Sequence, residues 1–95
     1  MEGVLWYVLA SSRGGSTRVR ILRALDERPQ NANQLAAELE MDYTTIRHHL
    51  DVLMKNNVVR RSGDNYGAVY LFTDQMESNW AIVEEILESV DPEDK

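Results

Sequence analysis

The sequence from Asn33 to Lys55, NQLAAELEMDYTTIRHHLDVLMK, decides the fold of this chain. It contains two short helical patterns with only a few residues between them. The apolar residues of the first pattern share one helix face: Leu35, Ala36 and Leu39. Those of the second pattern also share one face: Ile46, Leu50 and Leu53. Because the first helix has barely two turns, the pair does not suit a hairpin of long helices and instead predicts a helix-turn-helix.

Polar residues mark the ends of these two helices. Asn33 is the predicted N-cap of a first helix over 34–40, and Asp42 is the predicted N-cap of a second helix over 43–55. Asparagines at 56 and 57 close the second helix, since asparagine tolerates the left-handed conformation. When such a motif binds DNA, the second helix lies in the major groove. We therefore expect the helix over 43–55 to carry most of the sequence specificity.

Two further helices are predicted before this motif. The apolar run from Val4 to Ser11 predicts a short helix, which Ser12-Arg13-Gly14-Gly15 interrupts. Ser16 is the predicted cap of the next helix, and Pro29 ends that helix because proline lacks the amide donor. The apolar residues of this second helix are Val19, Ile21, Leu22 and Leu25.

After the motif, the hydrophobic period changes from helical to alternating. Residues 58–61 and 68–72 predict two short strands, and 62–67 is a turn-forming loop between them. Thr73 or Asp74 then caps a last helix that reaches about Val90. Its apolar stripe comprises Met76, Trp80, Val83, Leu87 and Val90. After the short N-terminal helix, the order is helix, helix, helix, hairpin, helix, which predicts a mainly α winged helix-turn-helix with a small β-hairpin and an additional C-terminal helix.

Three stretches, TRVRILRAL, NANQLAAEL and DYTTIRHHLDVL, resemble the ArsR-type winged-helix transcriptional regulators, particularly the small archaeal and bacterial ones. The resemblance covers about residues 13–73. It implies a dimeric DNA-binding regulator whose third helix reads the groove and whose hairpin wing contacts backbone or minor groove. The family's turn usually carries glycine where this chain has Glu40, and a positive φ there would cost roughly 1 kcal/mol. The family also often has a small hydroxyl residue at the position of Arg47, so its base preference does not transfer.

Length and composition predict one soluble domain over residues 1–95, with the winged-helix core at 13–73 and a frayed tail at 91–95. The apolar fraction of 43% is sufficient for a small core, which association would help to stabilise. There is no cysteine, which excludes disulfides, thiolate metal sites and a cysteine nucleophile. The apolar run near the N-terminus is too short to span a membrane. We therefore expect an intracellular, cytoplasmic protein.

The net charge of −6 is unusual for a protein that binds nucleic acid. Residues 1–73 hold nine basic and eight acidic residues, a net charge of +1, whereas residues 74–95 hold one basic and eight acidic residues, a net charge of −7. The acidic part is therefore the tail, and the motif itself is nearly neutral. Binding depends on the field at the contacted surface more than on the total charge.

The outward face of the helix over 43–55 supplies the predicted DNA contacts. Advancing 100° per residue from Ile46 as the inward direction places Thr44, His48 and Lys55 outward, with Thr45 on one flank and Arg47 on the other. Hydroxyl, imidazole and guanidinium groups can all bond base edges or phosphates. Asp51 also points outward, but a carboxylate repels phosphate, so we expect it to pair with a neighbouring cation. The alternative is a polar, solvated helix face.

The predicted wing adds further candidates. Arg60 and Arg61 alternate sides of the strand, so at most one faces a given partner. Tyr66, at the tip of the loop, could lie in the minor groove or cover apolar surface. The full set of predicted DNA-binding residues is Tyr43, Thr44, Thr45, Arg47, His48, Lys55, Arg60, Arg61 and Tyr66. The arginines of the first long helix, Arg18, Arg20 and Arg23 among them, are expected to form surface ion pairs with Asp26 or Glu27.

His48 and His49 suggest a metal site, but adjacent helical residues diverge by 100° and do not easily share one ion. His49 lies nearer the packed side, so we expect a hydrogen-bonded structural histidine and no metal or cofactor. No nucleophile–base pair or phosphate-binding loop is evident, because Arg13-Gly14-Gly15-Ser16 is too short and lacks the required lysine. The sequence therefore predicts a protein that is not an enzyme.

The terminal segments 1–12 and 74–90 are predicted to form a dimer interface. A lone winged helix has little core left to absorb their apolar residues, and a two-fold dimer would hold two recognition helices about 34 Å apart. The predicted interface residues are Leu5, Trp6, Leu9, Trp80, Val83, Leu87 and Val90. An unusually well-covered monomer is the alternative.

Together these features favour a sequence-specific, homodimeric regulator bound to double-stranded DNA at a palindromic site, with no membrane partner and an unidentified effector. The alternative is a winged-helix module that docks onto proteins and does not bind DNA, a use that suits an acidic chain.

Overall fold

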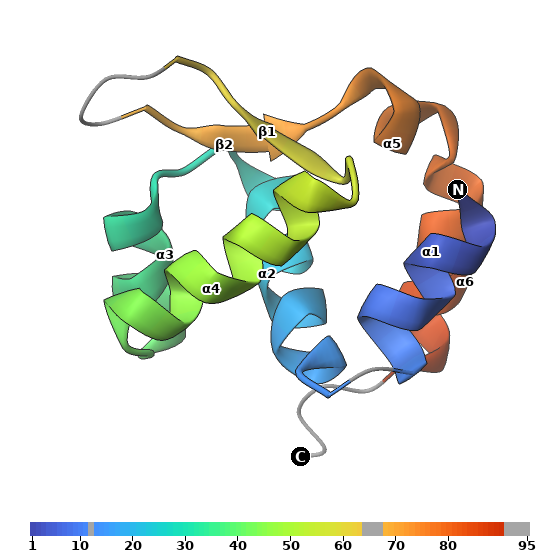
Figure 1. Cartoon of the computed structure of the whole chain (residues 1–95), viewed down its shortest axis with the longest axis horizontal. Coiled ribbons are helices and arrows are strands. Elements are labelled where there is room, and N and C mark those ends of the chain that lie inside the picture. The colour runs from blue at the N-terminus through green and yellow to red at the C-terminus, as the bar shows by residue number, and fades with distance from the viewer. Residues whose placement is uncertain (12, 64–67, 91–95) are drawn as a thin grey trace.

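A computed structural model describes residues 1–11, 13–63 and 68–90, and it has the winged helix-turn-helix fold (Figure 1). The elements are α1 (Glu2–Trp6), the π-helical turn η1 (Tyr7–Ser11), α2 (Gly15–Glu27), α3 (Ala32–Leu39), α4 (Tyr43–Lys55), β1 (Val59–Arg61), β2 (Tyr70–Phe72), α5 (Asp74–Ser78) and α6 (Trp80–Ser89). The predicted order of helices and hairpin is confirmed. Tyr66 and the predicted tail at 91–95 lie outside the described residues.

Side-chain caps fix the two helices of the helix-turn-helix. The carboxylate of Asp42 accepts hydrogen bonds from the amides of Thr44 at 2.9 Å and Thr45 at 3.2 Å, which confirms the predicted start of α4. The predicted cap of α3 was wrong by two residues, because Asn31 and Gln34 form a reciprocal capping box. This box satisfies two amide groups at once, which favours the earlier start.

Three positive φ angles end or begin helices around the motif. Asn57 has a φ of 65° just after α4, as its left-handed tolerance predicts, and Glu40 has a φ of 57° after α3. The predicted cap of α2 at Ser16 was wrong: the helix begins at Gly15, and Gly14, with a φ of 87°, makes the turn before it. A Cβ on Gly15 would lie 2.7 Å from the carbonyl oxygen of Leu9. The absence of a side chain at Gly15 therefore lets η1 approach the start of α2.

The wing is shorter than the predicted strands. β1 and β2 pair antiparallel with Arg60 opposite Leu71, and an isolated bridge joins Tyr70 to Gln30. The amide of Tyr70 donates to the carbonyl of Gln30 at 2.8 Å, and the buried Gln30 side chain donates to the carbonyl of Ala24 at 3.1 Å. These bonds connect the base of the wing to the loop that follows α2.

The last predicted helix is two helices. Asn79 interrupts it between α5 and α6, and its side chain donates to the carbonyl of Gln75 at 2.8 Å. Such local bonds compete with the helical pattern, which is why asparagine favours helix ends. Thr73 caps α5 by accepting from the amide of Met76 at 3.0 Å, so the predicted start is confirmed and the uninterrupted helix was wrong.

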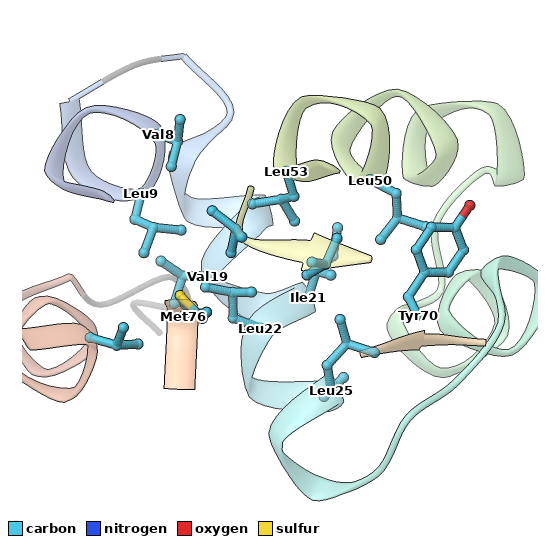
Figure 2. Packing of buried hydrophobic residues seen from close by; sticks show 14 of the residues in the cluster. Val8, Leu9, Val19, Ile21, Leu22, Leu25, Leu50, Leu53, Tyr70 and Met76 are labelled. Carbon is cyan, nitrogen blue, oxygen red and sulfur yellow. The ribbon is translucent and has the colours of Figure 1, made fainter. Parts of the chain in front are cut away.

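The core gathers around α2. In Figure 2, Leu50 and Leu53 of α4 and Leu9 of η1 point toward the side chains of α2, and all three are fully buried. The N-terminal segment and α6 close the other end of the core, with Leu5 and Val83 also fully buried. The expectation that one chain cannot absorb its terminal apolar residues was therefore wrong, because α1, η1 and α6 pack on one another and η1 packs on α2.

Candidate nucleic-acid interface

The outward face of α4 is open in this structure. Figure 1 shows α4 running across α2, with the wing along one side. Tyr43, Thr44, His48 and Lys55 are exposed, whereas Ile46, Leu50 and Leu53 are buried against the core. Thr45 is half-buried on one flank. The inward and outward directions of α4 are therefore those that the sequence predicts.

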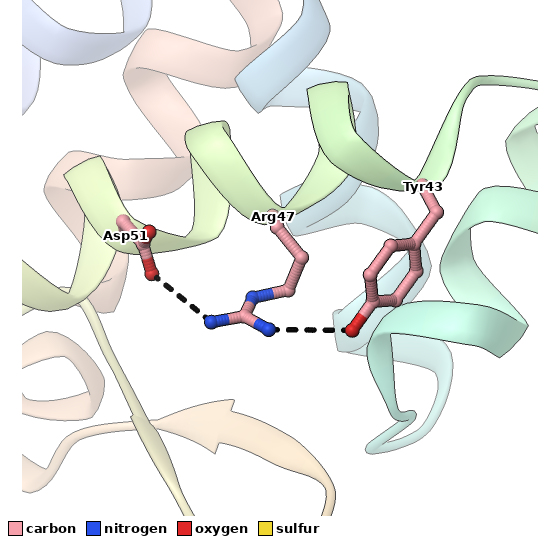
Figure 3. Close-up of polar contacts among 3 residues, drawn as sticks. All are labelled: Tyr43, Arg47 and Asp51. Carbon is pink, nitrogen blue, oxygen red and sulfur yellow. Dashed lines mark hydrogen bonds and ion pairs between the residues drawn. The ribbon is translucent and has the colours of Figure 1, made fainter.

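Arg47 lies on the opposite flank of α4 and has a partner on each side (Figure 3). Its Nη1 donates to the hydroxyl of Tyr43 at 3.2 Å, and its Nη2 lies 3.9 Å from Oδ1 of Asp51. The bond to Tyr43 raises the pKa of Arg47, with a smaller contribution from Asp51. The predicted pairing of Asp51 with a neighbouring cation is confirmed.

The wing places two cations beside α4. Arg60 and Arg61 are both exposed, and the guanidinium carbon of Arg61 lies 6.0 Å from the centre of the Tyr70 ring. Arg61 is directly opposite Tyr70 in the strand register, which explains this contact. With Lys55 at the end of α4, the wing and helix carry exposed positive charges on neighbouring elements.

His49 is buried on the side of α4 that faces α2, and its Nδ1 lies 3.1 Å from Nη1 of Arg18. Burial lowers the pKa of His49, and the charge of Arg18 lowers it further, followed by that of His48. Gly14 lies against this pair, because a Cβ there would lie 2.8 Å from Cε1 of His49. The predicted structural, hydrogen-bonded histidine is confirmed.

The buried Arg18 joins the N-terminal segment to α4. Its Nε donates to the carbonyl of Val8 at 2.8 Å, and its Nη2 donates to the carbonyl of Arg13 at 3.0 Å. Burial lowers its pKa. Sequence reasoning missed this role, because nothing in the sequence distinguishes Arg18 as a buried residue from the other arginines of α2.

The other arginines of α2 also serve the main chain. Arg20 donates to the carbonyl of Leu39 at 3.1 Å, and Arg23 donates to the carbonyl of Leu87 at 2.9 Å. The surface ion pairs with Asp26 or Glu27 stay a prediction, whereas these bonds form because the ends of α3 and α6 bring carbonyl groups within reach of Arg20 and Arg23. The arginines of α2 therefore connect it to η1, α3, α4 and α6.

The predicted interface residues separate into two groups. Leu5, Leu9, Val83 and Leu87 are buried inside the chain, so their place at a surface contact was wrong for this conformation. The other three are half-buried: Trp6, Trp80 and Val90. Two other residues of the predicted segment 1–12 are more exposed, Val4 at 40% and Tyr7 at 63%.

Among the residues that the structure describes, no group of three or more histidine, aspartate or glutamate side chains could hold a metal ion. The rings of His48 and His49 lie edge to face with centres 5.4 Å apart. None of the described helices combines the length and apolar character needed to cross a membrane.

Residues 15–61, from the start of α2 to the end of β1, match the family described as "Bacterial regulatory protein, arsR family". The chain carries an ArsR-family helix-turn-helix domain. Members of this family are DNA-binding transcriptional regulators, which are generally not enzymes, and the match supports DNA-binding regulation as the general function of this domain. The family resemblance seen in the sequence is thereby confirmed.

Two solved structures show the same fold. The crystal structure of M. tuberculosis Rv0081 is 21% identical, with a TM-score of 0.68 over 93% of this chain and 86% of that chain. The structure of disulfide-formed AbfR is 20% identical, with a TM-score of 0.64 over 95% of this chain and 62% of that chain. This chain has no cysteine. No curated protein matches its sequence significantly.

Proposed function

We propose that this ArsR-family protein is a homodimeric, sequence-specific regulator that binds a palindromic site in double-stranded DNA. In this proposal, α4 lies in the major groove and the wing contacts backbone or minor groove. The observation that carries the proposal is the open polar face of α4, where Thr44, His48 and Lys55 are exposed beside the exposed arginines of β1. A cytoplasmic location is part of this proposal, because the DNA of bacteria and archaea lies there.

The distribution of charge supports this orientation. Exposed acidic side chains occupy the C-terminal helices: Asp74, Glu77, Glu84, Glu85 and Glu88. Figure 1 shows α1 and α6 together at one end of the molecule, with α3 at the other end. The acidic helices therefore lie away from the N-terminal half of α4, where base contacts are expected. A groove-facing surface can be locally basic although the chain is acidic overall.

The exposed apolar residues of the N-terminal segment support a dimer. Val4 and Tyr7 are exposed, and the half-buried Trp6, Trp80 and Val90 lie on the same pair of packed segments. A two-fold contact through α1, η1 and α6 would bury these side chains without disturbing the core beneath them. Such a dimer would present two α4 helices to successive turns of the major groove.

Selection of bound sites from a random pool of double-stranded DNA tests the proposal. We expect an enriched inverted repeat whose half-site centres lie about 10 base pairs, or a multiple of the helical turn, apart. Enrichment of a single half-site would contradict the dimer. No enrichment, together with flow through a heparin column at low salt, would contradict DNA binding and favour the protein-docking module that the acidic charge suits.

A further inference from the structure

The flank of α4 that carries Arg47 differs from a simple polar face because the arginine is held from both sides. Tyr43, Arg47 and Asp51 follow one another at intervals of four residues, so they form a stripe along the helix (Figure 3). The Tyr43 hydroxyl and the Asp51 carboxylate lie on opposite sides of the guanidinium. An arginine held at both ends loses less conformational freedom when it binds a ligand than a free side chain does.

The number of free N–H donors on this guanidinium limits how it can bind a ligand. Arginine has five N–H donors, one on Nε and two on each terminal nitrogen. The Nε of Arg47 is buried and has no described partner, so it does not face an incoming ligand. Tyr43 accepts from Nη1, and Asp51 lies beside Nη2. One N–H on each terminal nitrogen is left, and these two donors can bind a pair of adjacent acceptors end-on.

Guanine is the base that presents such a pair. Its O6 and N7 are both acceptors in the major groove, whereas adenine pairs an acceptor with a donor, cytosine presents a donor, and thymine presents one acceptor beside a methyl group. A phosphate also offers paired oxygens, but it is an anion. The carboxylate of Asp51, 3.9 Å from Arg47, repels an anion and leaves a neutral base edge unopposed.

The position of Arg47 along α4 agrees with a base contact. Tyr43 is the first residue of the helix, and Arg47 lies one turn further on. Residues near the start of a recognition helix are those that reach base edges. The wing arginines and Lys55 are exposed without such a neighbouring carboxylate within ion-pair distance among the described residues, which suits them to phosphate.

We infer that Arg47 is the specificity-determining residue for one guanine in each half-site, and that Tyr43 and Asp51 are positioning residues that hold its guanidinium for that contact. The inference rests on the proposed function, since it requires α4 to lie in the major groove. The inference adds to the proposed function the identity of one contacted base. It also assigns a role to Asp51, whose negative charge does not itself favour binding to DNA.

The test measures binding of the full chain to the site selected by the wild-type protein, and to versions of that site with each G·C pair replaced in turn. Fluorescence anisotropy at one fixed salt concentration gives the affinities. We expect one G·C pair per half-site whose replacement weakens wild-type binding roughly 10- to 100-fold. Arg47→Ala should abolish discrimination at that pair and leave discrimination at the other pairs unchanged.

The positioning residues have a separate signature. Asp51→Asn and Tyr43→Phe should each lower discrimination at the same G·C pair several-fold, and Asp51→Asn should also strengthen binding to unrelated DNA because it removes a negative charge. Asp51→Glu should retain more discrimination than Asp51→Asn. The matched control is Asp26→Asn on α2, which makes the same change of charge at an exposed position away from α4 and should leave discrimination at wild-type strength.

Two results would overturn the inference. If Arg47→Ala weakens binding to the selected site and to every replaced site by the same factor, Arg47 grips backbone and does not read a base. If Asp51→Asn and Tyr43→Phe leave discrimination unchanged while Arg47→Ala abolishes it, the positioning role is wrong. A wild-type protein that selects no site at all would instead overturn the proposed function, so the two failures are distinguishable. Circular dichroism of each variant verifies the fold.

Discussion

Glu40 shows the clearest conflict between a residue and its backbone. It occupies the turn of the helix-turn-helix with a φ of 57°, a region that side chains with a Cβ adopt at a cost of roughly 1–2 kcal/mol. Its amide still donates to the carbonyl of Ala37 at 3.3 Å. The turn therefore forms because the packed helices on either side require it, and the residue itself is strained.

Replacing Glu40 should relieve that strain. We expect Glu40→Gly to raise the free energy of unfolding by roughly 0.5 kcal/mol, because the relief exceeds the extra entropy of glycine in the unfolded chain. Glu38→Gly, two residues earlier and within α3, should lower it by about 1 kcal/mol. Thermal denaturation of both variants gives the comparison. Equal destabilisation by the two substitutions would show that the left-handed turn is not strained.

His49 makes stability depend on pH. Unfolded His49 has its ordinary pKa of 6.5, whereas burial beside Arg18 lowers the pKa in the folded chain. Below pH 6.5, and down to the lower folded pKa, the unfolded chain binds a proton that the folded chain does not. The contribution of His49 is therefore complete above pH 6.5 and is lost as the pH falls below it.

The variant His49→Asn separates this contribution from that of other groups, since an asparagine oxygen can accept from Arg18 at any pH. We expect the melting temperature of the wild-type protein to fall more between pH 7.5 and 5.5 than that of His49→Asn. The control His48→Asn changes the exposed neighbour and should retain most of the wild-type dependence, because burial and Arg18 lower the pKa of His49 more than His48 does. A fall of the same size in His49→Asn would contradict the assignment.

At the scale of elements, prediction succeeded where the signal is local. Asp42 and the apolar spacing of α4 are sufficient to place that helix from Tyr43 to Lys55, because cap and amphipathic face lie within one segment. The α3 start at Asn31 was missed because two asparagines compete there, and only the partner Gln34 distinguishes them. The break at Asn79 was missed because the apolar stripe continues across it.

The sequence was sufficient to predict which side of α4 faces outward, but not which distant segments the arginines of α2 contact. The outward side of α4 follows from helical geometry alone, and the pairing of Asp51 with a cation follows from charge. The carbonyl partners of Arg18, Arg20 and Arg23 were not predictable, because they come from segments distant in sequence. The same reason explains why burial of Leu5 and Val83 within one chain was missed: it depends on packing between the two termini.

The terminal elements have a buried side and an exposed side. Substitutions on the buried side should lower stability, whereas substitutions on the exposed side should affect dimerisation. Leu5→Ala should lower the free energy of unfolding by about 2–5 kcal/mol, because Leu5 is fully buried. Tyr7→Asp should leave that fold largely intact, because Tyr7 is 63% exposed, but should dissociate the proposed dimer. Sedimentation velocity and thermal denaturation on the same samples separate the effects. A Tyr7→Asp protein that remains dimeric would exclude this face from the interface.

At the scale of the whole molecule, the net negative charge of the chain opposes its binding to DNA, which is also negatively charged. Residues 74–95 have a net charge of −7, whereas residues 1–73, which contain the helix-turn-helix, have a net charge of +1. Lys55, Arg60 and Arg61 are exposed and Arg47 is half-buried on neighbouring parts of α4 and β1. If each neutralises one phosphate per subunit, which requires both wing arginines to reach DNA although they leave opposite sides of β1, a dimer releases counterions from roughly eight phosphates. Should Arg47 read guanine instead, the number falls to about six.

The salt dependence of affinity for the selected DNA site tests this account most directly. The measurement is the slope of the logarithm of the binding constant against the logarithm of salt concentration. With eight phosphates neutralised by the dimer we expect a slope of about −7, and with six a slope of about −5. A slope shallower than about −2 would contradict the claim that α4 and the wing present their cations to DNA.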